Sequence, residues 1–154
     1  MRIFPSGFCK KAQKIKQENA LAELRNWFRL IFFQANEPQS WLSFTPPPER
    51  WKGLEIVIKT WKNTWKKAFN VWAFAIDDAP PDIKTDPEMI DAAKQVFLCA
   101  LRDDDAKLKY YEFVHDIENS CLMKDRDCKR AFAHMRIDAL EWLEIQRDHR
   151  EDLR

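Results

Sequence analysis

The chain has 154 residues, of which 45% are hydrophobic and 33% charged, a composition typical of one globular domain and unlike that of a disordered chain or a membrane bundle. It contains only two glycines. Phosphate-binding loops, nucleophile elbows and β-hairpin turns all use glycine, so this shortage argues against nucleotide-binding enzymes and against β-rich folds. The net charge is only +1, but this average hides a division along the chain.

The two halves of the sequence carry opposite charge. Residues 1–75 hold 13 Lys and Arg against 5 Asp and Glu, a net charge of +8, whereas residues 76–154 hold 13 against 20, a net charge of −7. This division predicts a basic surface for an anionic partner, or else attraction between the two halves within one fold.

The first 17 residues contain five basic side chains and no acidic one. A basic, acid-poor N-terminus is typical of mitochondrial presequences, although arginine and serine are sparse here. We therefore expect an intracellular protein, in the mitochondrion or otherwise in the cytoplasm. Pro5 and Gly7 interrupt a helix, so an extended conformation is one option for the basic segment 1–17, at least before the first predicted helix.

The four cysteines contain no CxxC pair, and no secretory signal peptide opens the chain, so a reducing compartment is expected. Cys121 and Cys128 flank a short charged turn between two predicted helices. A disulfide between them is an option that we do not favour.

Hydrophobic periodicity predicts an all-α fold of five helices. Their ranges are 10–36, 49–76, 85–101, 106–122 and 125–150. A Pro-rich linker at 37–48 and a turn at 77–85 connect the first three. We expect one bundle-like domain over residues 1–154, in which two long N-terminal helices pack with a three-helix C-terminal unit.

The first predicted helix carries an apolar run from Trp27 to Phe33 that is interrupted by Arg29. A helix that is apolar nearly all round is enclosed by other helices, and this run is shorter than the ~20 residues that span a bilayer. We expect a central core helix.

Local signals mark the starts of two later helices. A capping pattern starts the third helix: Thr85 or Asp86 as the cap, then Pro87, and Glu88 in the first turn. The aspartates at 103–105 are suited to end that helix and to cap the fourth.

The second predicted helix is strongly amphipathic and rich in tryptophan. Its apolar positions recur three and four residues apart and form one stripe: Leu54, Ile58, Trp61, Trp65, Phe69, Trp72 and Ile76. Tryptophan fills protein interiors, so core packing is one interpretation of this stripe. Tryptophan also dominates the energetics of protein interfaces, and the number of tryptophans here exceeds what a core of this size requires.

We take the second interpretation as a hypothesis and assign partner binding to the tryptophans and lysines of this region. They are Trp51, Trp61, Trp65, Trp72, Lys59, Lys62, Lys66 and Lys67. The expected function is that of a non-catalytic helical accessory or scaffold subunit, which binds other protein subunits through this helix and through the basic N-terminal half. Nucleic acid or an anionic membrane surface is a further partner for the basic half.

Two alternatives stay open. One is a nucleic-acid-binding subunit of a ribonucleoprotein or phage-defence complex, and the other is a small protein inhibitor. The stripe separates tryptophan from lysine and does not interleave them, which speaks against base stacking beside phosphate contacts.

We expect no catalytic residues, metal ligands, cofactor or small-molecule substrate. The candidate metal ligands are His115, Cys121, Cys128 and His134, with five or six residues between successive members. Structural zinc sites use tighter pairs, and all four positions fit on or near apolar helix faces. No Ser, Cys or His is spaced in a way that indicates a nucleophile with its base.

Overall fold

The computed structural model describes the backbone of residues 6–36 and 40–152 and the side chains of residues 13–36 and 40–149. Helices make up 84% of the described residues, among which there is no strand, so the predicted all-α fold is confirmed. The chain divides into two compact units, Met1–Thr64 and Trp65–Arg154, which are described separately below. The arrangement of 1–154 as one domain stays a prediction.

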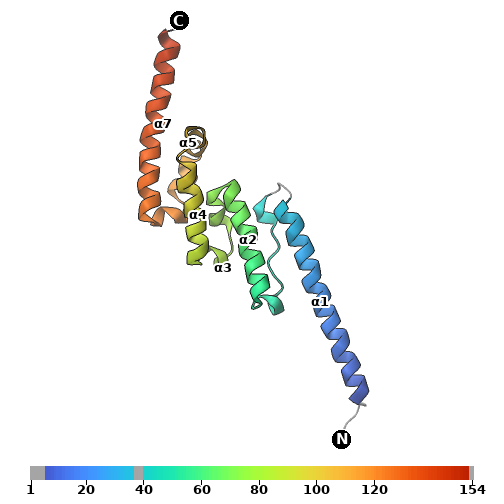
Figure 1. Cartoon of the computed structure of the whole chain (residues 1–154). Helices are drawn as coiled ribbons and strands as arrows, with labels where there is room; N and C mark the ends of the chain where they lie inside the picture. The colour runs from blue at the N-terminus through green and yellow to red at the C-terminus, as the bar shows by residue number, and fades with distance from the viewer. Residues whose placement is uncertain (1–5, 37–39, 153–154) are drawn as a thin grey trace. The chain divides into compact units, whose positions relative to one another are not determined.

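Five of the described helices have seven or more residues, and each matches one predicted helix. The α-helices are α1 (Ser6–Asn36), α2 (Glu55–Val71), α3 (Pro81–Lys84), α4 (Pro87–Ala100), α5 (Asp104–Tyr111), α6 (Val114–Glu118) and α7 (Arg126–Asp152) (Figure 1). Short 3-10 helices lie at Trp41–Ser43, Glu49–Trp51, Ala73–Asp78 and Cys121–Lys124.

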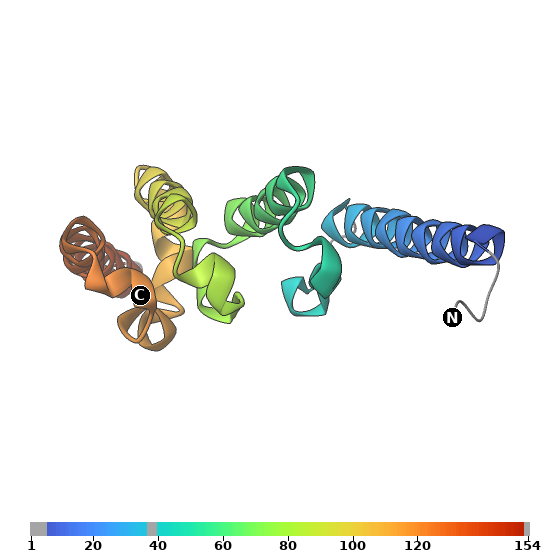
Figure 2. The same ribbon diagram turned by 90° about the horizontal axis from the view of Figure 1, so that it is seen from below.

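In the first unit, α1 is held by the non-helical segment that follows it. Gln34 bonds Thr45 twice: its Nε2 donates to the Thr45 hydroxyl at 3.1 Å, and its Oε1 accepts the Thr45 N–H at 2.9 Å. Trp27 Nε1 donates to the Thr45 carbonyl at 3.0 Å, and Trp51 Nε1 donates to the Ala20 carbonyl at 3.2 Å. Figure 2 shows the segment beginning beside the C-terminal end of α1. Side-chain hydrogen bonds thus compensate for backbone that has no helical partner.

One expectation for this unit is wrong. The helix α1 begins at Ser6, so residues 6–9, which precede the predicted helix, are helical and not extended. The linker at 37–48 also contains the short helix Trp41–Ser43, which Ser40 caps by accepting the Leu42 N–H. Residues 1–5 and 37–39 lie outside the described part of the chain.

The second predicted helix, 49–76, is too long at both ends. The helix α2 runs only from Glu55 to Val71, and its buried side chains recur at the spacing of one helical face: Val57, Trp61, Thr64, Trp65, Ala68 and Phe69. Leu54 and Ile58 of the predicted stripe are exposed. At Trp72 the backbone is extended, with φ −154° and ψ 112°, and this ends the helix. The buried Ile76 belongs to the separate 3-10 helix Ala73–Asp78.

In the second unit, five aromatic side chains form a cluster from Ala73–Asp78, α4 and α5 with their flanking residues. The cluster comprises Trp72, Phe74, Phe97, Tyr110 and Phe113. Trp72 stacks on Tyr110 with ring centroids 4.7 Å apart, while Phe74 meets Phe97 edge-on at 5.0 Å. Phe97 meets Tyr110 at 5.5 Å. These offset and edge-on arrangements are the favoured geometries for aromatic pairs, so the cluster forms a well-packed core.

The predicted starts of α4 and α5 are confirmed. The Asp86 carboxylate accepts the Glu88 N–H at 2.8 Å, with Pro87 in the first helical position. The Asp103 carboxylate likewise accepts the Asp105 N–H at 3.3 Å. Capping depends on residues two or three positions apart, which is why the sequence alone identifies it.

The predicted helix 106–122 is wrong as one element, because the structure breaks it into α5, α6 and the 3-10 helix Cys121–Lys124. The break falls at Phe113, with φ −111° and ψ 28°. Tyr110 and Ile117, on either side of this break, are both buried. The predicted turn at 77–85 also contains the four-residue α3, whose first residue is Pro81.

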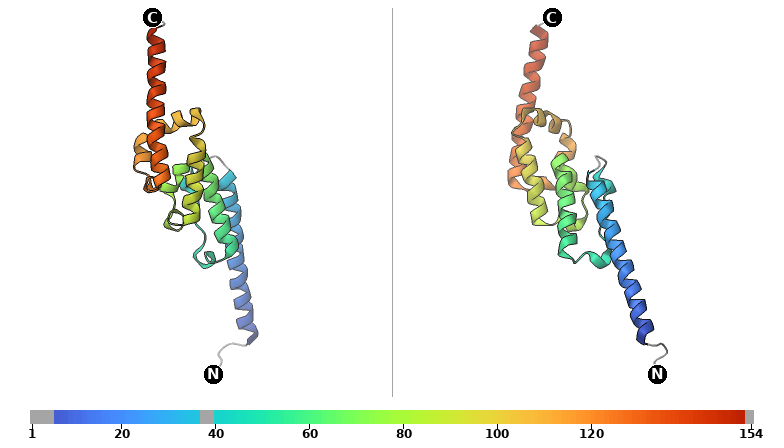
Figure 3. Two further views of the ribbon diagram at one scale, coloured as in Figure 1. Left: turned by 60° about the vertical axis from the view of Figure 1, so that its left-hand side comes forward. Right: turned by 45° about the vertical axis from the view of Figure 1, so that its right-hand side comes forward.

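The last predicted helix is confirmed as α7. Asp125 precedes it and accepts the Cys128 N–H at 3.0 Å. The side chains of Cys128, Phe132, Met135 and Ala139 are buried, whereas every residue from 140 to 149 is exposed. Figure 3 accordingly shows the C-terminal half of α7 extending past the other helices of its unit. No described helix is long and apolar enough to cross a membrane.

Candidate protein-interaction surfaces

The structure places the predicted tryptophans in or near the interior. Trp61 and Trp65 are 4% and 3% exposed, and the Trp61 ring lies 6.5 Å from that of Trp27. Trp51 and Trp72 are half-buried, the first bonded to α1 and the second stacked in the aromatic cluster. Core packing accounts for these positions. The partner-binding role of the region as a whole stays a prediction.

The four predicted lysines lie away from the buried face of α2. Lys59 and Lys67 are exposed, and Lys62 is half-buried. Lys66 Nζ lies 2.9 Å from a Glu88 carboxylate oxygen, and both residues belong to the second unit. The structure therefore does not bring the tryptophans and lysines together on one exposed surface.

The C-terminal half of α1 presents large apolar side chains to solvent. Trp27 and Ile31 are buried, but Phe32 is 70% exposed and Phe33 is 58% exposed, and Leu30 is exposed as well. The expectation that this run is enclosed on all sides is wrong, because only one face of α1 packs within its unit. Exposed neighbouring phenylalanines are costly in water and mark surfaces that bind partners.

A basic and apolar stripe can be traced on the unpacked side of α1. Leu21, Arg25, Arg29 and Phe32 lie three or four residues apart, so they share one helix face, and all four are exposed. Phe33 borders this stripe. We refer to these five residues as the α1 face.

The C-terminal half of α7 has a matching stripe of opposite charge. Ile137, Leu140, Glu141, Glu144 and Ile145 are exposed and share the side of α7 opposite its buried residues. Ile145 is 63% exposed. We refer to these five residues as the α7 face. Trp142 and Leu143, on the packed side of α7, are exposed because they lie beyond the last neighbouring helix.

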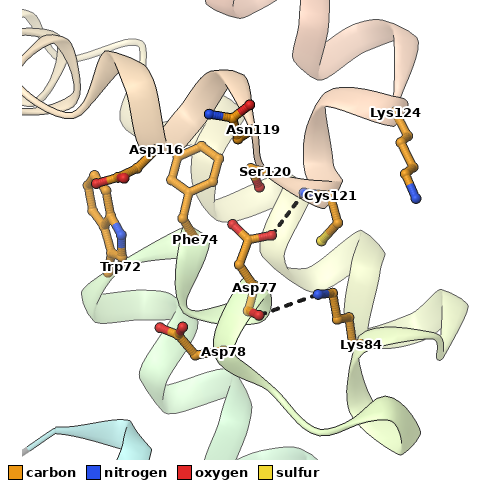
Figure 4. Close-up of a pocket in the computed structure, with 10 residues that line it drawn as sticks. All are labelled: Trp72, Phe74, Asp77, Asp78, Lys84, Asp116, Asn119, Ser120, Cys121 and Lys124. Atoms are coloured by element: carbon orange, nitrogen blue, oxygen red, sulfur yellow. Dashed lines mark hydrogen bonds between the residues drawn. The ribbon is translucent and has the colours of Figure 1, made fainter.

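The second unit also contains a polar hollow of about 580 Å³, shown in Figure 4. Trp72, Phe74 and Asp116 lie at one end, and Lys84 and Cys121 lie at the other. The Asp77 carboxylate at its centre accepts the Cys121 N–H at 2.8 Å, and the Asp77 carbonyl accepts a bond from Lys84 Nζ at 3.4 Å. Asp77 thus ties Ala73–Asp78 to the start of Cys121–Lys124, which is a structural role.

Burial makes two thiols of this unit, those of Cys121 and Cys128, poor nucleophiles. Burial, helped by a hydrogen bond with Asp77, raises the pKa of Cys121 to about 11. Burial also raises the pKa of Cys128 to about 12, together with the nearby Asp125 carboxylate. Because the thiolate is the reactive form, both side chains are unreactive near neutral pH. Cys99, Cys121 and Cys128 are free thiols, so the disulfide between Cys121 and Cys128 is not formed.

Among the described side chains, no three or more of His, Cys, Asp and Glu gather where they would hold a metal ion. The strongest ionic cluster instead supports the start of α7. Lys94 Nζ lies 3.0 Å from Asp127 and 3.1 Å from Asp125, and these two hydrogen bonds raise the pKa of Lys94. Burial alone would raise the pKa of Asp125, but hydrogen bonds from the Cys128 N–H and Lys94 hold it below its usual value.

Sequence reasoning missed the α1 and α7 faces, although a signal was present. Ile137, Leu140 and Ile145 fall outside the inward-facing positions of their own helix. Apolar residues on two sides of a helix indicate either full enclosure or a second contact surface. Only the structure separates these possibilities, because it shows which side remains uncovered.

All of these features belong to an all-α fold. Comparison with protein-family models, with curated proteins and with solved structures found no match.

Proposed function

We propose that this chain is a non-catalytic helical accessory or scaffold subunit that binds other protein subunits through the α1 and α7 faces. The observation that carries the proposal is the exposure of large apolar side chains on the two longest helices. They are Ile15, Leu21, Leu30, Phe32 and Phe33 on α1, and Ile137, Leu140, Trp142, Leu143 and Ile145 on α7.

Their arrangement favours protein over other partners. Apolar side chains surrounded by charged ones are the composition of a specific protein interface, with an apolar centre and a polar rim. On the α1 face, Arg25 and Arg29 stand beside Leu21 and Phe32, and arginine and aromatic residues are enriched where binding energy concentrates. The α7 face carries carboxylates, which would repel both nucleic acid and an anionic membrane.

The buried tryptophans of α2 have a supporting role in this proposal. Trp61 and Trp65 are buried and pack α2 into the core. The exposed residues of the two long helices, α1 and α7, bind the partner. This differs from an interface built on the tryptophans themselves.

The test is affinity purification of the tagged full chain from its native cell, with and without nuclease and at low and moderate salt. A scaffold subunit retains stoichiometric protein partners under all four conditions, since burial of apolar surface is weakly sensitive to salt. The variant with Leu21→Ser and Phe32→Ser should lose them, while Lys59→Ser and Lys67→Ser on α2 should not. Loss of all partners on nuclease treatment would instead support the nucleic-acid-binding alternative.

A further inference from the structure

The two uncovered faces of this chain have complementary chemistry. Counted over its whole length, α1 carries six Lys and Arg against two Glu. Residues 137–152 of α7 carry six Asp and Glu against two Arg. Opposite net charges on two exposed apolar helix surfaces favour contact between them, whereas pairing α1 with α1 or α7 with α7 would oppose like charges.

The α7 face is short enough to lie within the length of the α1 face. From Leu21 to Phe33 the α1 face is about 18 Å long, and from Ile137 to Ile145 the α7 face is about 12 Å long, at 1.5 Å per residue. Each stripe has apolar residues near its ends, with two charged residues one turn apart between them. Arg25 and Arg29 can therefore meet Glu141 and Glu144 while Phe32 and Leu21 pack against Ile137 and Ile145.

We propose that the α1 face of one copy of this chain binds the α7 face of a second copy. The proposal rests on the proposed function and names one partner subunit as another molecule of the same chain. Every copy carries both faces. Two copies form a closed dimer if the α1 face of each binds the α7 face of the other. If each pair of copies makes only one such contact, the copies assemble head to tail into a longer oligomer. The apolar residues maintain the contact at moderate salt, and the charged residues make the association weaker at high salt.

The first experiment measures the mass of the purified full chain by size-exclusion chromatography with light scattering, at concentrations up to roughly 100 μM, which detects contacts of modest affinity. The wild-type chain should exceed the mass of one copy. A wild-type chain that remains a single copy throughout this range overturns the proposal.

The second experiment reverses the charges on each face. Arg25→Glu with Arg29→Glu makes both faces acidic, and Glu141→Lys with Glu144→Lys makes both faces basic. Each double variant alone should dissociate at concentrations about tenfold higher than the wild type, or more, because like charges now face each other. Mixing the two variants should restore association, since each acidic face then meets a basic one. All four side chains are exposed, so the folded helices should be retained, as circular dichroism will check.

A matched control reverses two exposed charges elsewhere on α7, with Lys129→Glu and Arg130→Glu. This variant should associate like the wild type. Phe32→Ser gives an independent, uncharged test and should also weaken association about tenfold. Equal loss in the control, unchanged association of the charge variants, or failure of the mixture to restore it would each overturn the proposed contact.

The outcomes also separate this inference from the proposed function. Other protein subunits recovered from the native cell together with a single-copy mass in solution would sustain the scaffold role and remove only the self-contact. Self-association in solution without any other recovered subunit would sustain the self-contact and remove the role in a mixed assembly.

Discussion

The two units of this chain stabilise their helices in different ways. In the second unit, aromatic rings pack against one another and form a core. These rings belong to Trp72, Phe74, Phe97 and Tyr110. In the first unit, α1 packs by one narrow face and is tied to the following segment by hydrogen bonds from a few side chains, chiefly Gln34. The second unit thus contains its own core, whereas the first leaves much of its longest helix uncovered.

This difference shows where a partner matters most. A helix with large exposed apolar residues and few tertiary contacts gains more from an added surface than one that is already enclosed. We expect the aromatic core to dominate the stability of the isolated chain. The α1 and α7 faces should contribute only when they are covered.

The largest effect should follow removal of a central ring from the second unit. Phe97 is fully buried and contacts Phe74 and Tyr110, so Phe97→Ala should lower the free energy of unfolding by about 3–5 kcal/mol. Urea unfolding followed by tryptophan fluorescence measures this change. Leu42→Ala, at a residue that is 70% exposed and belongs to neither face, serves as control and should change it by less than about 0.5 kcal/mol. If both variants lowered the free energy of unfolding by similar amounts, the aromatic cluster would not be the main source of stability.

The next effect concerns the tie between α1 and the segment after it. Gln34→Ala removes both hydrogen bonds to Thr45 and should cost about 1–2 kcal/mol. Hydrogen exchange of the amides of residues 40–45 should become faster, while the second unit stays unchanged. Gln17→Ala, at an exposed position on the same helix, should have no effect. If exchange at 40–45 does not change, the segment is held by other contacts.

A smaller effect is expected at the start of α7, and it depends on pH. Asp125→Ala removes the cap on the Cys128 N–H and should cost about 1 kcal/mol near neutral pH. The folded chain lowers the pKa of Asp125 below its ordinary value of 3.8, so the charged carboxylate stabilises the fold above that pH. This stability is lost as the pH falls through the lower folded value.

Urea unfolding at several pH values tests this prediction. The difference between the wild type and Asp125→Ala should be present above about pH 4 and shrink below it. Glu141→Ala, which removes an exposed carboxylate from the middle of α7, provides the comparison. A difference that stays constant down to strongly acidic pH would contradict the role given to the carboxylate.

The smallest expected effect concerns the reactivity of the cysteine thiols and involves no change in stability. Alkylation at pH 8 followed by peptide mass spectrometry should modify the exposed Cys99 much faster than Cys121 or Cys128. The pKa values of the last two are raised to about 11 and about 12, so few of their side chains are thiolates at that pH. In denaturant the three rates should converge. Rapid modification of Cys128 in the folded chain would show that this part of the unit opens.

The sequence predicts those parts of the fold that local interactions determine. The caps at Asp86 and Asp103 involve neighbouring residues, so both were predictable. The boundaries of α2 were not, since its end at Trp72 depends on the stacking of that ring on Tyr110, 38 positions further along the chain. The break at Phe113 likewise serves contacts with distant residues.

The interaction surfaces could be predicted only in part. Tryptophan spacing in α2 indicated a strong apolar face, and the structure uses Trp61 and Trp65 for packing. The exposed faces of α1 and α7 contain more ordinary residues, and periodicity alone does not show which sides of a helix have neighbours. That distinction depends on where the rest of the chain lies.

The most direct test of the interaction surfaces is photo-crosslinking in the native cell. A photoreactive amino acid would replace Phe32 on the α1 face and, separately, Ile145 on the α7 face, with exposed Asn70 on α2 as the control site. We predict discrete protein adducts from positions 32 and 145 that are absent from position 70. Adducts no stronger than those of the control, or adducts with nucleic acid in place of protein, would contradict the assignment of these faces to protein binding.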